Sequence, residues 1–209
     1  RQNHSVVSFS DKSSMSQILF VRHGPTEWNE SRRIQGRTDV ELSADGERLA
    51  ASWRLKPPYS EWHCFCSPLK RARRTASLLG FKNMTSVDLL QEMNWGHWEG
   101  HTLESLRRID PQAFRRNEDR GLDFRPPGGE SPQDVCHRLR TWLNTLSDQH
   151  LPAVAVCHKG VLRAALSIAI DWDMMDDPPE KLLDGCGHLY RLENQNLVLE
   201  KINIKLSSN

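Results

Sequence analysis

The residues with the clearest chemical potential are Arg22 and His23, which follow an apolar run at residues 18–21 and precede Gly24 and Pro25. The short run, β-branched at both ends, predicts a buried strand that stops at the Gly-Pro pair. A strand that turns into a helix leaves backbone N–H groups free to bind an anion. Arginine adds a charge suited to phosphate, and a neutral imidazole can attack phosphorus. Taken alone, the sequence Arg22-His23-Gly24 also fits a histidine at a strand end that has no catalytic role and only hydrogen-bonds to the backbone.

Three further segments have the same form, an apolar run that ends in polar residues. Strands are expected at residues 62–66, 89–90 and 153–157, which lead into Arg71, Glu92 and His158 respectively. If these strands are neighbours in one parallel sheet, the three side chains and His23 meet at its carboxyl edge, where open α/β sheets bind ligands. That edge would then combine a nucleophile, an acid and the positive charges of an anion pocket.

The remaining patterns predict the elements that position this edge. Helices are expected at residues 43–55, 69–79, 102–109, 111–117, 132–146 and 161–170, from apolar residues at helical spacing and from stop signals. Thr26 and Ser43 are N-cap candidates. Period-two patterns at 188–192 and 197–204 predict a terminal hairpin around 193–195. Alternating strands and helices predict an α/β protein, a three-layer α/β/α sandwich whose mostly parallel central sheet has an antiparallel edge.

Length and composition narrow the class of protein. The 209 residues suit one domain at residues 18–209, preceded by a Ser-rich polar tail at residues 1–17 that we expect to be flexible. The formal net charge of +1 predicts no nucleic-acid partner and no membrane partner, and no run approaches the ~18 apolar residues of a membrane span. Five scattered cysteines favour reduced thiols and a cytoplasmic location, with Cys64 and Cys66 in the core.

A metal site is not expected from the sequence. His97 and His101 have the spacing of helical metal ligands, but Gly96 and Gly100 favour a loop there. No further set of Cys and His ligands accompanies them. We therefore expect neither a metal nor another cofactor.

Five motifs run along the chain in a fixed order. They are RHGPTEWN at 22–29, SPLKRARRTA at 67–76, LQEMNWGHWEG at 90–100, PPGGES at 126–131 and CHKGVLRA at 157–164. Each is weak alone, but together they resemble the histidine phosphatase superfamily, also called the phosphoglycerate mutase-like family. The resemblance covers most of the chain and implies the phosphoglycerate mutase-like fold.

The resemblance implies a role for each catalytic candidate. His23 would carry the phosphoryl group, with its other ring nitrogen held by a backbone carbonyl. Glu92 would act as general acid and later as general base. Arg22, Arg71 and His158 would bind the phosphoryl group. Only the family register selects Arg71, because a run of charges on a helix is usually a solvated face.

Substrate contacts follow from the same resemblance. Asn29, Gln35 and Gly36 match positions that touch and bind substrate in the family. The chain departs from the family pattern at Lys159, beside His158, where the added charge could reach the pocket rim or point to solvent. This departure puts substrate preference in doubt but removes no catalytic group.

The resemblance implies a metal-independent phosphomonoester hydrolase that acts through a phosphohistidine on a small phosphorylated metabolite. The fairly short segment before PPGGES is similar to the small phosphatase branch, whereas cofactor-dependent phosphoglycerate mutases carry a longer insertion. A mutase, an α-ribazole phosphatase and an inactive module that binds phosphate esters stay open, and so does the oligomeric state, with a homodimer as one option. The arginines of the lid segment (residues 102–125) either meet a second acidic group of the substrate or form a solvated helix pair. They are Arg107, Arg108, Arg115, Arg116, Arg120 and Arg125.

Overall fold

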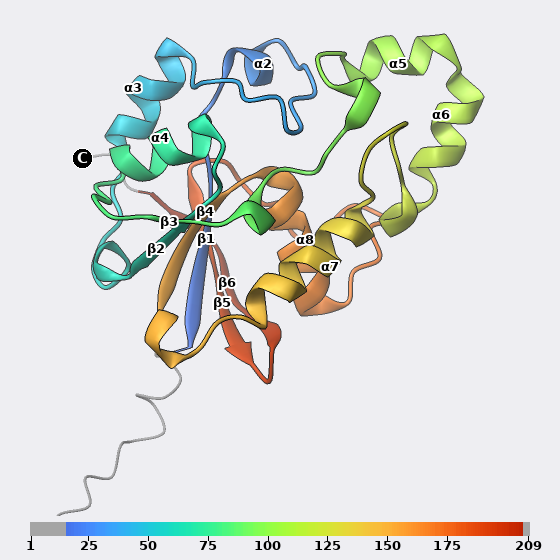
Figure 1. Ribbon diagram of the computed structural model, residues 1–209. Helices are drawn as coiled ribbons and strands as arrows, with labels where there is room; N and C mark the ends of the chain where they lie inside the picture. Colours follow the sequence, from blue (N-terminus) through green and yellow to red (C-terminus); the bar gives the residue numbers. More distant parts are fainter. Residues whose placement is uncertain (1–15, 207–209) are drawn as a thin grey trace, which may run out of the picture.

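A mixed sheet of six strands, in the order β3-β2-β4-β1-β5-β6, forms the centre of the computed structural model, which describes residues 16–206 (Figure 1). The strands are β1 (Gln17–Arg22), β2 (His63–Cys66), β3 (Thr85–Ser86), β4 (Ala153–Cys157), β5 (Cys186–Glu193) and β6 (Asn196–Lys205). Strands β3, β2, β4 and β1 are parallel, and β5 and β6 add an antiparallel hairpin at one edge. The predicted mostly parallel sheet with an antiparallel edge is confirmed.

Helices cover both faces of this sheet. They are α2 (Glu27–Glu30), α3 (Ala44–Ser52), α4 (Lys70–Leu78), α5 (Leu103–Ile109), α6 (Pro111–Glu118), α7 (Pro132–Leu143) and α8 (Lys159–Ile170), with short 3-10 turns η1 (Tyr59–Glu61), η2 (Asp88–Leu90), η3 (Gly96–Trp98), η4 (Gly121–Asp123) and η5 (Asp148–His150). Figure 1 shows α3 and α4 on one face, α7 and α8 on the other, and α5 and α6 standing away from the sheet. The three-layer α/β/α sandwich is therefore confirmed.

Alternating side chains of β1 build two cores. Ile18 and Phe20 pack into the cluster that contains residues of α7 and α8, whereas Leu19 and Val21 pack into the cluster beneath α3 and α4. Because successive residues of a strand face opposite sides, one apolar run serves both layers. The run is fully buried, and it fixes the carboxyl end of β1 between the two helical layers.

Local signals place most helix starts correctly. The side chain of Thr26 accepts a hydrogen bond from the Asn29 amide, and that of Ser43 accepts one from the Gly46 amide, so both predicted N-caps are confirmed. The hairpin turn also falls where it was predicted, with Asn194 between β5 and β6. These features depend on neighbours in sequence, which is why pattern alone finds them.

The strand predicted at 89–90 is wrong, because β3 is the short segment Thr85–Ser86 and residues 88–90 form η2. The amide of Val87 still donates to the carbonyl of Cys66, after which the chain leaves the sheet and Leu90 turns into the core. Most of the predicted tail lies outside the described residues, and Gln17 already belongs to β1.

Candidate functional site

The two histidines of the site come from the carboxyl ends of neighbouring strands. β1 and β4 are parallel, with Arg22 opposite Cys157, and the amide of His23 donates to the carbonyl of Cys157 at 3.0 Å. The next residue of each chain segment is then a histidine, and the ring centroids of His23 and His158 are 5.1 Å apart. The sheet thus brings together two motifs separated by 135 positions in the sequence.

His23 is held in one orientation by its own backbone neighbour. Its Nδ1 lies 2.6 Å from the carbonyl oxygen of Gly24, an acceptor only, so Nδ1 carries the hydrogen and donates it. The amide of Gly24 in turn donates to Oγ1 of Thr75 at 2.9 Å, which fixes the turn. Burial, together with the nearby positive charges of Arg22 and Arg71, holds the pKa of His23 well below its usual range. The ring is therefore neutral near pH 7, with the electron pair of Nε2 free.

Arg71 is fully buried at the start of α4. Its two terminal nitrogens donate to the carbonyl oxygens of Thr38 (2.9 Å) and Gly36 (2.7 Å). Its Nε has no hydrogen-bond partner among the described residues. Burial lowers the pKa of Arg71, and the negative charge of Glu92 opposes that shift. Its neighbours Lys70, Arg73 and Arg74 are exposed, so burial distinguishes Arg71 where the charge run could not.

Glu99 holds the loop that orients Arg71. Its Oε1 accepts hydrogen bonds from the amides of Arg37 (2.9 Å) and Trp95 (3.1 Å), and its Oε2 accepts one from the amide of Thr38 (2.9 Å). Gly36 has φ of +56°, and a β-carbon there would lie 1.9 Å from Oε1 of Glu99. Glu99 was missed by sequence reasoning, although it lies inside the LQEMNWGHWEG motif.

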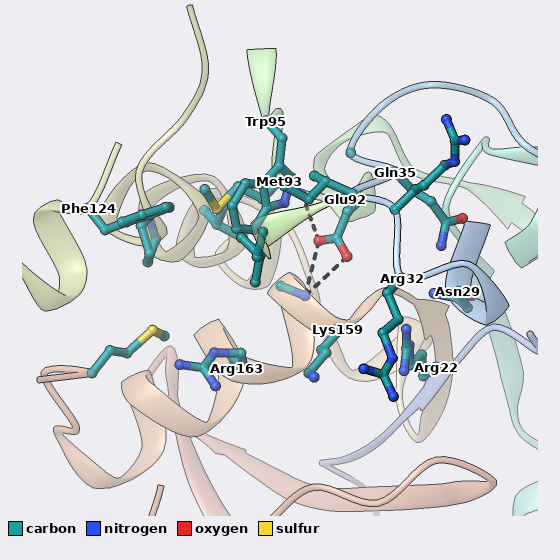
Figure 2. Close-up of a pocket in the computed structure, with 18 of the residues that line it drawn as sticks. Arg22, Asn29, Arg32, Gln35, Glu92, Met93, Trp95, Phe124, Lys159 and Arg163 are labelled. Atoms are coloured by element: carbon teal, nitrogen blue, oxygen red, sulfur yellow. Dashed lines mark hydrogen bonds between the residues drawn. The ribbon is translucent and has the colours of Figure 1, made fainter. Parts of the chain in front are cut away.

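Glu92 follows the 3-10 turn η2 and lines the same pocket as His23. Figure 2 shows its carboxylate among the other residues of the pocket wall. Its Oε1 accepts hydrogen bonds from the amides of Met93 (2.7 Å) and Gly160 (3.0 Å), whereas Oε2 makes a single longer contact of 3.3 Å with the Gly160 amide. Oε1 is thus engaged by the backbone. Oε2 is the oxygen better placed to hold or release a proton.

Arg22 and His158 have polar atoms without partners. Arg22 pairs with Asp184 through one terminal nitrogen at 2.5 Å, and its buried Nε has no hydrogen-bond partner among the described residues. His158 is fully buried; its Nε2 lies 2.7 Å from Oγ of Ser67, while Nδ1 lacks a partner in the same part of the chain. Burial, with the nearby His23 and arginines, holds the pKa of His158 well below its usual range. Ser67 was missed by sequence reasoning as a partner of this histidine.

A pocket of about 520 Å³ opens above these residues and is large enough for a small metabolite. Its walls include Arg22, His23, Asn29, Gln35, Gly36, Arg71 and Glu92. His158 lies beneath, against His23, and does not itself form the wall. The buried Oε1 of Gln35 has no hydrogen-bond partner within residues 16–206, whereas Oδ1 of Asn29 accepts from the amide of Thr26. All eight predicted site residues therefore gather in one place.

The lid arginines do not line this pocket. All six belong to the described part of the chain, and none is among its wall residues. Three of them make ion pairs instead, Arg107 with Glu118, Arg108 with Glu104 and Arg125 with Asp134. The structure does not support the hypothesis that these arginines meet a second acidic group of the substrate. All six are exposed outside the pocket wall, and three of them pair with other side chains.

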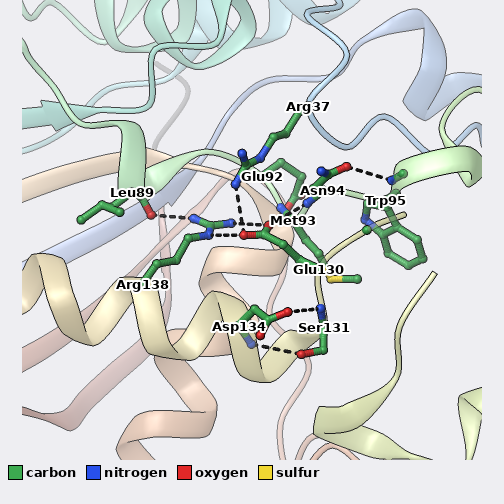
Figure 3. A network of polar contacts seen from close by, with 12 residues as sticks. Arg37, Leu89, Glu92, Met93, Asn94, Trp95, Glu130, Ser131, Asp134 and Arg138 are labelled. Atoms are coloured by element: carbon green, nitrogen blue, oxygen red, sulfur yellow. Dashed lines mark hydrogen bonds and ion pairs between the residues drawn. The ribbon is translucent and has the colours of Figure 1, made fainter. Parts of the chain in front are cut away.

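Glu130 of the PPGGES motif stabilises the loop that contains Glu92 (Figure 3). Its carboxylate pairs with Arg138 on α7 at 3.1 Å and accepts a hydrogen bond from the amide of Asn94 at 2.8 Å. Arg138 also donates to the carbonyl oxygen of Leu89 at 2.6 Å. The loop is thus held on both sides of Glu92. The sequence shows the motif but not this contact.

The described part of the chain contains neither a metal-binding cluster nor a membrane-spanning helix. Within residues 16–206, no group of three or more His, Cys, Asp or Glu side chains is arranged to hold a metal ion. The helices of the same residues include none long and apolar enough to cross a membrane. The five cysteines, all in this part of the chain, are buried and free, and Cys64 and Cys66 pack in the core under α3 and α4 as predicted.

Comparison with known proteins decides the family. The sequence profile of the histidine phosphatase superfamily (branch 1) matches residues 18–205. The chain belongs to this superfamily. Among curated members, phosphoglycerate mutase-like protein 4 of Arabidopsis thaliana is 34% identical over 165 residues, covering 74% of this chain and 71% of the relative. Probable phosphoglycerate mutase GpmB of Escherichia coli is 35% identical over 141 residues, 64% of either protein.

Solved structures of the superfamily agree with this assignment. TTHB049 of Thermus thermophilus superimposes with a TM-score of 0.69 at 32% identity, covering 91% of this chain and 99% of that one. A phosphoserine phosphatase of Entamoeba histolytica, in complex with 3-phosphoglyceric acid, gives 0.72 at 26% identity, covering 90% and 96%. A mycobacterial glucosyl-3-phosphoglycerate phosphatase gives 0.74 at 24% identity, covering 91% and 100%, and shows the common fold.

Proposed function

We propose that this superfamily member hydrolyses small phosphomonoesters through a phosphohistidine at His23, without a metal ion. The observation that carries the proposal is the bond from Nδ1 of His23 to the carbonyl oxygen of Gly24 at 2.6 Å. It leaves Nε2 as the unprotonated nitrogen, in a ring kept neutral by burial and by Arg22 and Arg71. A neutral, oriented imidazole beside two arginines is what attack on a phosphoryl group needs.

The reaction would proceed in two displacements. In the first, Nε2 of His23 forms a bond to phosphorus, the ester P–O bond breaks, and the leaving oxygen takes a proton from Glu92. In the second, water gives a proton back to Glu92 and its oxygen bonds to phosphorus, while the P–N bond breaks. Inorganic phosphate leaves and His23 is neutral again.

The phosphoryl oxygens would be held by Arg22, Arg71 and His158. The buried Nε atoms of both arginines and Nδ1 of His158 lack partners among the described residues, and an oxyanion would satisfy such groups. Binding of a dianion also relieves the repulsion between the neighbouring cations Arg22 and Arg71. Asn29, Gln35 and Gly36 would contact the substrate from the pocket wall.

Hydrolysis is favoured over mutase chemistry by the fairly short segment between Glu92 and PPGGES, which consists of the helices α5 and α6 and the 3-10 turns η3 and η4. The structural neighbours at 32% and 26% identity, TTHB049 and the phosphoserine phosphatase, cover most of the chain, and the second carries phosphatase in its name. The curated relatives carry mutase names, so the mutase is the outcome that the experiment must separate.

A ³¹P NMR time course in EDTA tests the proposal. The sample contains 3-phosphoglycerate, a trace of 2,3-bisphosphoglycerate and an aryl phosphate. We expect inorganic phosphate to grow with the wild type and not with His23→Ala, while His137→Ala, an exposed histidine on α7, behaves as the wild type. Rapid acid-free quenching should show phosphate bound to the wild-type protein. Conversion to 2-phosphoglycerate would instead establish a mutase, and turnover by His23→Ala would exclude the phosphohistidine.

A further inference from the structure

The pocket contains more positive charge than one phosphoryl group requires. Six cationic side chains lie in its wall, Arg22, Arg32, Arg33, Arg71, Lys159 and Arg163, against the two carboxylates of Glu92 and Glu118. The phosphoryl clamp uses Arg22 and Arg71. The terminal nitrogen of Arg33 donates to the carbonyl oxygen of Gly100 at 3.2 Å. Arg32, Lys159 and Arg163 are left without a function in the proposed reaction.

No carboxylate of the pocket neutralises these three side chains. Glu118 pairs with Arg107, and Glu92 is engaged by backbone amides. Within residues 16–206, Arg32, Lys159 and Arg163 make no ion pair. Figure 2 shows Lys159 between Arg163 on one side and Arg22 and Arg32 on the other. The three charges therefore line one continuous side of the pocket.

Two of the charges lie on one face of α8. Lys159 begins the helix directly after His158, and Arg163 follows four residues later, about 6 Å along the helix axis. The guanidinium of Arg163 lies over the ring of Trp172 at 4.7 Å from its centroid, which limits its movement. Burial, then Arg22 and Arg163, lowers the pKa of Lys159, and the charge of Asp184 opposes this. An anion placed among these groups would relieve their repulsion.

Arg32 stands where the backbone favours glycine. Its φ is +56°, in the left-handed region, which costs a residue with a β-carbon about 1 kcal/mol. Its amide donates to the carbonyl oxygen of Asn29 at 3.1 Å, and the amide of Arg33 donates to that of Trp28 at 2.7 Å, the two bonds that end α2 with a left-handed residue. The end of α2 therefore sets the backbone position from which the side chain of Arg32 reaches the pocket wall.

We propose that Arg32, Lys159 and Arg163 form a second anion subsite, which receives a carboxylate or second phosphate of the substrate while its scissile phosphate lies at His23. The preferred substrates are then small phosphomonoesters with two acidic groups, and these three residues determine specificity. This inference rests on the proposed function for the position of the first phosphate. It places the determinants on α8 and the loop after α2 rather than on the lid segment.

Matched substrate pairs test the subsite. The carboxylate pair is 3-phosphoglycerate and glycerol 3-phosphate, and the phosphate pair is butane-1,4-diol bisphosphate and its monophosphate. The readout is the ratio of kcat/KM within each pair. We expect the wild type to prefer the member with the second acidic group by at least tenfold in one pair, which also identifies that group. Lys159→Met should reduce the ratio about tenfold, and Arg32→Gly severalfold.

Controls separate specificity from damage to the fold. Lys56→Met, an exposed lysine outside the pocket wall, should leave the ratio unchanged. Arg32→Gly should keep or raise the melting temperature, because glycine relieves the positive φ, while still lowering the ratio. Arg163→Lys retains the charge and should lower the ratio less than Arg163→Gln. Equal preference within both pairs, or loss of rate without change of ratio, would overturn the subsite.

Failure of the proposed function gives a different result. If the wild type hydrolyses no phosphomonoester, the same pairs are titrated by calorimetry in EDTA. A ratio of Kd values above ten that falls in Lys159→Met would support the subsite in a protein that is not a phosphatase. Equal Kd values within both pairs would reject the subsite as well.

Discussion

The amide nitrogen of Gly160 lies 3.0 Å from Oε1 of Glu92, which ties the candidate general acid to the first turn of α8, two residues after His158. A β-carbon on Gly160 would lie 2.3 Å from the same oxygen. Glycine at this position therefore allows the carboxylate of Glu92 to reach the pocket. The acid and the second histidine are positioned by the same short stretch of chain.

Gly160→Ala should consequently displace Glu92 without removing it. General acid catalysis contributes about 10²–10⁴ in rate, so we expect kcat for an alkyl phosphate to fall at least tenfold. An aryl phosphate, whose leaving group needs less help from a proton, should lose clearly less. The comparison requires kcat for both substrates in the wild type and the variant, with melting temperatures as a check on folding. Equal losses on both substrates would argue against Glu92 as the acid.

His23 should become protonated only at a lower pH than an ordinary histidine. Burial and the charges of Arg22 and Arg71 hold its pKa well below 6.5, so the neutral ring should persist when the pH is lowered from 7 to 5.5. An ordinary histidine would be about 90% protonated at pH 5.5. An NMR titration of the imidazole signals, with His23→Ala to identify the resonance, measures this directly. A midpoint near 6.5 in the free protein would contradict the proposed nucleophile.

Asp184 should compete with phosphate for Arg22. The two side chains pair at 2.5 Å, but Asp184 is largely exposed, so the pair is worth at most about 1 kcal/mol. Asp184→Asn should therefore tighten inhibition by inorganic phosphate two- to fivefold at low salt, and the gain should shrink at 0.5 M salt. Asp45→Asn, which removes the exposed pair with Arg48, is the control. Weaker inhibition in Asp184→Asn would mean that Asp184 orients Arg22 rather than competing for it.

His188 should make the fold sensitive to acid. It is fully buried in β5, Nε2 has no partner among the described residues, and burial lowers its pKa from 6.5 to about 4. The unfolded chain then binds the proton first as the pH falls, so stability is complete above about pH 6.5 and is lost progressively towards pH 4.

At pH 5 this effect amounts to about 2 kcal/mol of the free energy of unfolding. Urea unfolding at pH 7 and pH 5 should show that His188→Asn loses less stability on acidification than the wild type by about that amount. His137→Asn, at an exposed position, serves as the control. If His188→Asn and the wild type lose the same stability, His188 is not the group responsible.

The positions of the catalytic candidates could be predicted because they follow from strand ends. The apolar runs before His23 and His158 are recognisable locally, and parallel pairing of β1 with β4 brings their ends together. Glu92 lies at the predicted edge of the sheet, but the 3-10 turn η2 positions it there instead of the strand predicted at 89–90. A short apolar run does not distinguish a strand from a buried turn, because both place leucine in the core.

Long-range contacts explain what the sequence could not predict. Arg71 is distinguished from its charged neighbours Lys70, Arg73 and Arg74 by burial, and its guanidinium bonds the carbonyl groups of the loop at residues 36–38. Glu99 and its contacts with the same loop involve residues about sixty positions apart. No periodicity in the chain encodes such a pairing.

The layers, the order of the motifs and the residues that could carry the chemistry can be predicted from the chain, because hydrophobic period and turn residues act over a few neighbours. Which cations enter the pocket becomes clear from the folded molecule alone. The lid arginines pair elsewhere or lie outside its wall, whereas Lys159 and Arg163 enter it because α8 begins directly at the edge of the sheet. Whether a charged side chain faces the pocket or the solvent depends on packing between elements that are distant in the sequence, and no local sequence pattern predicts that packing.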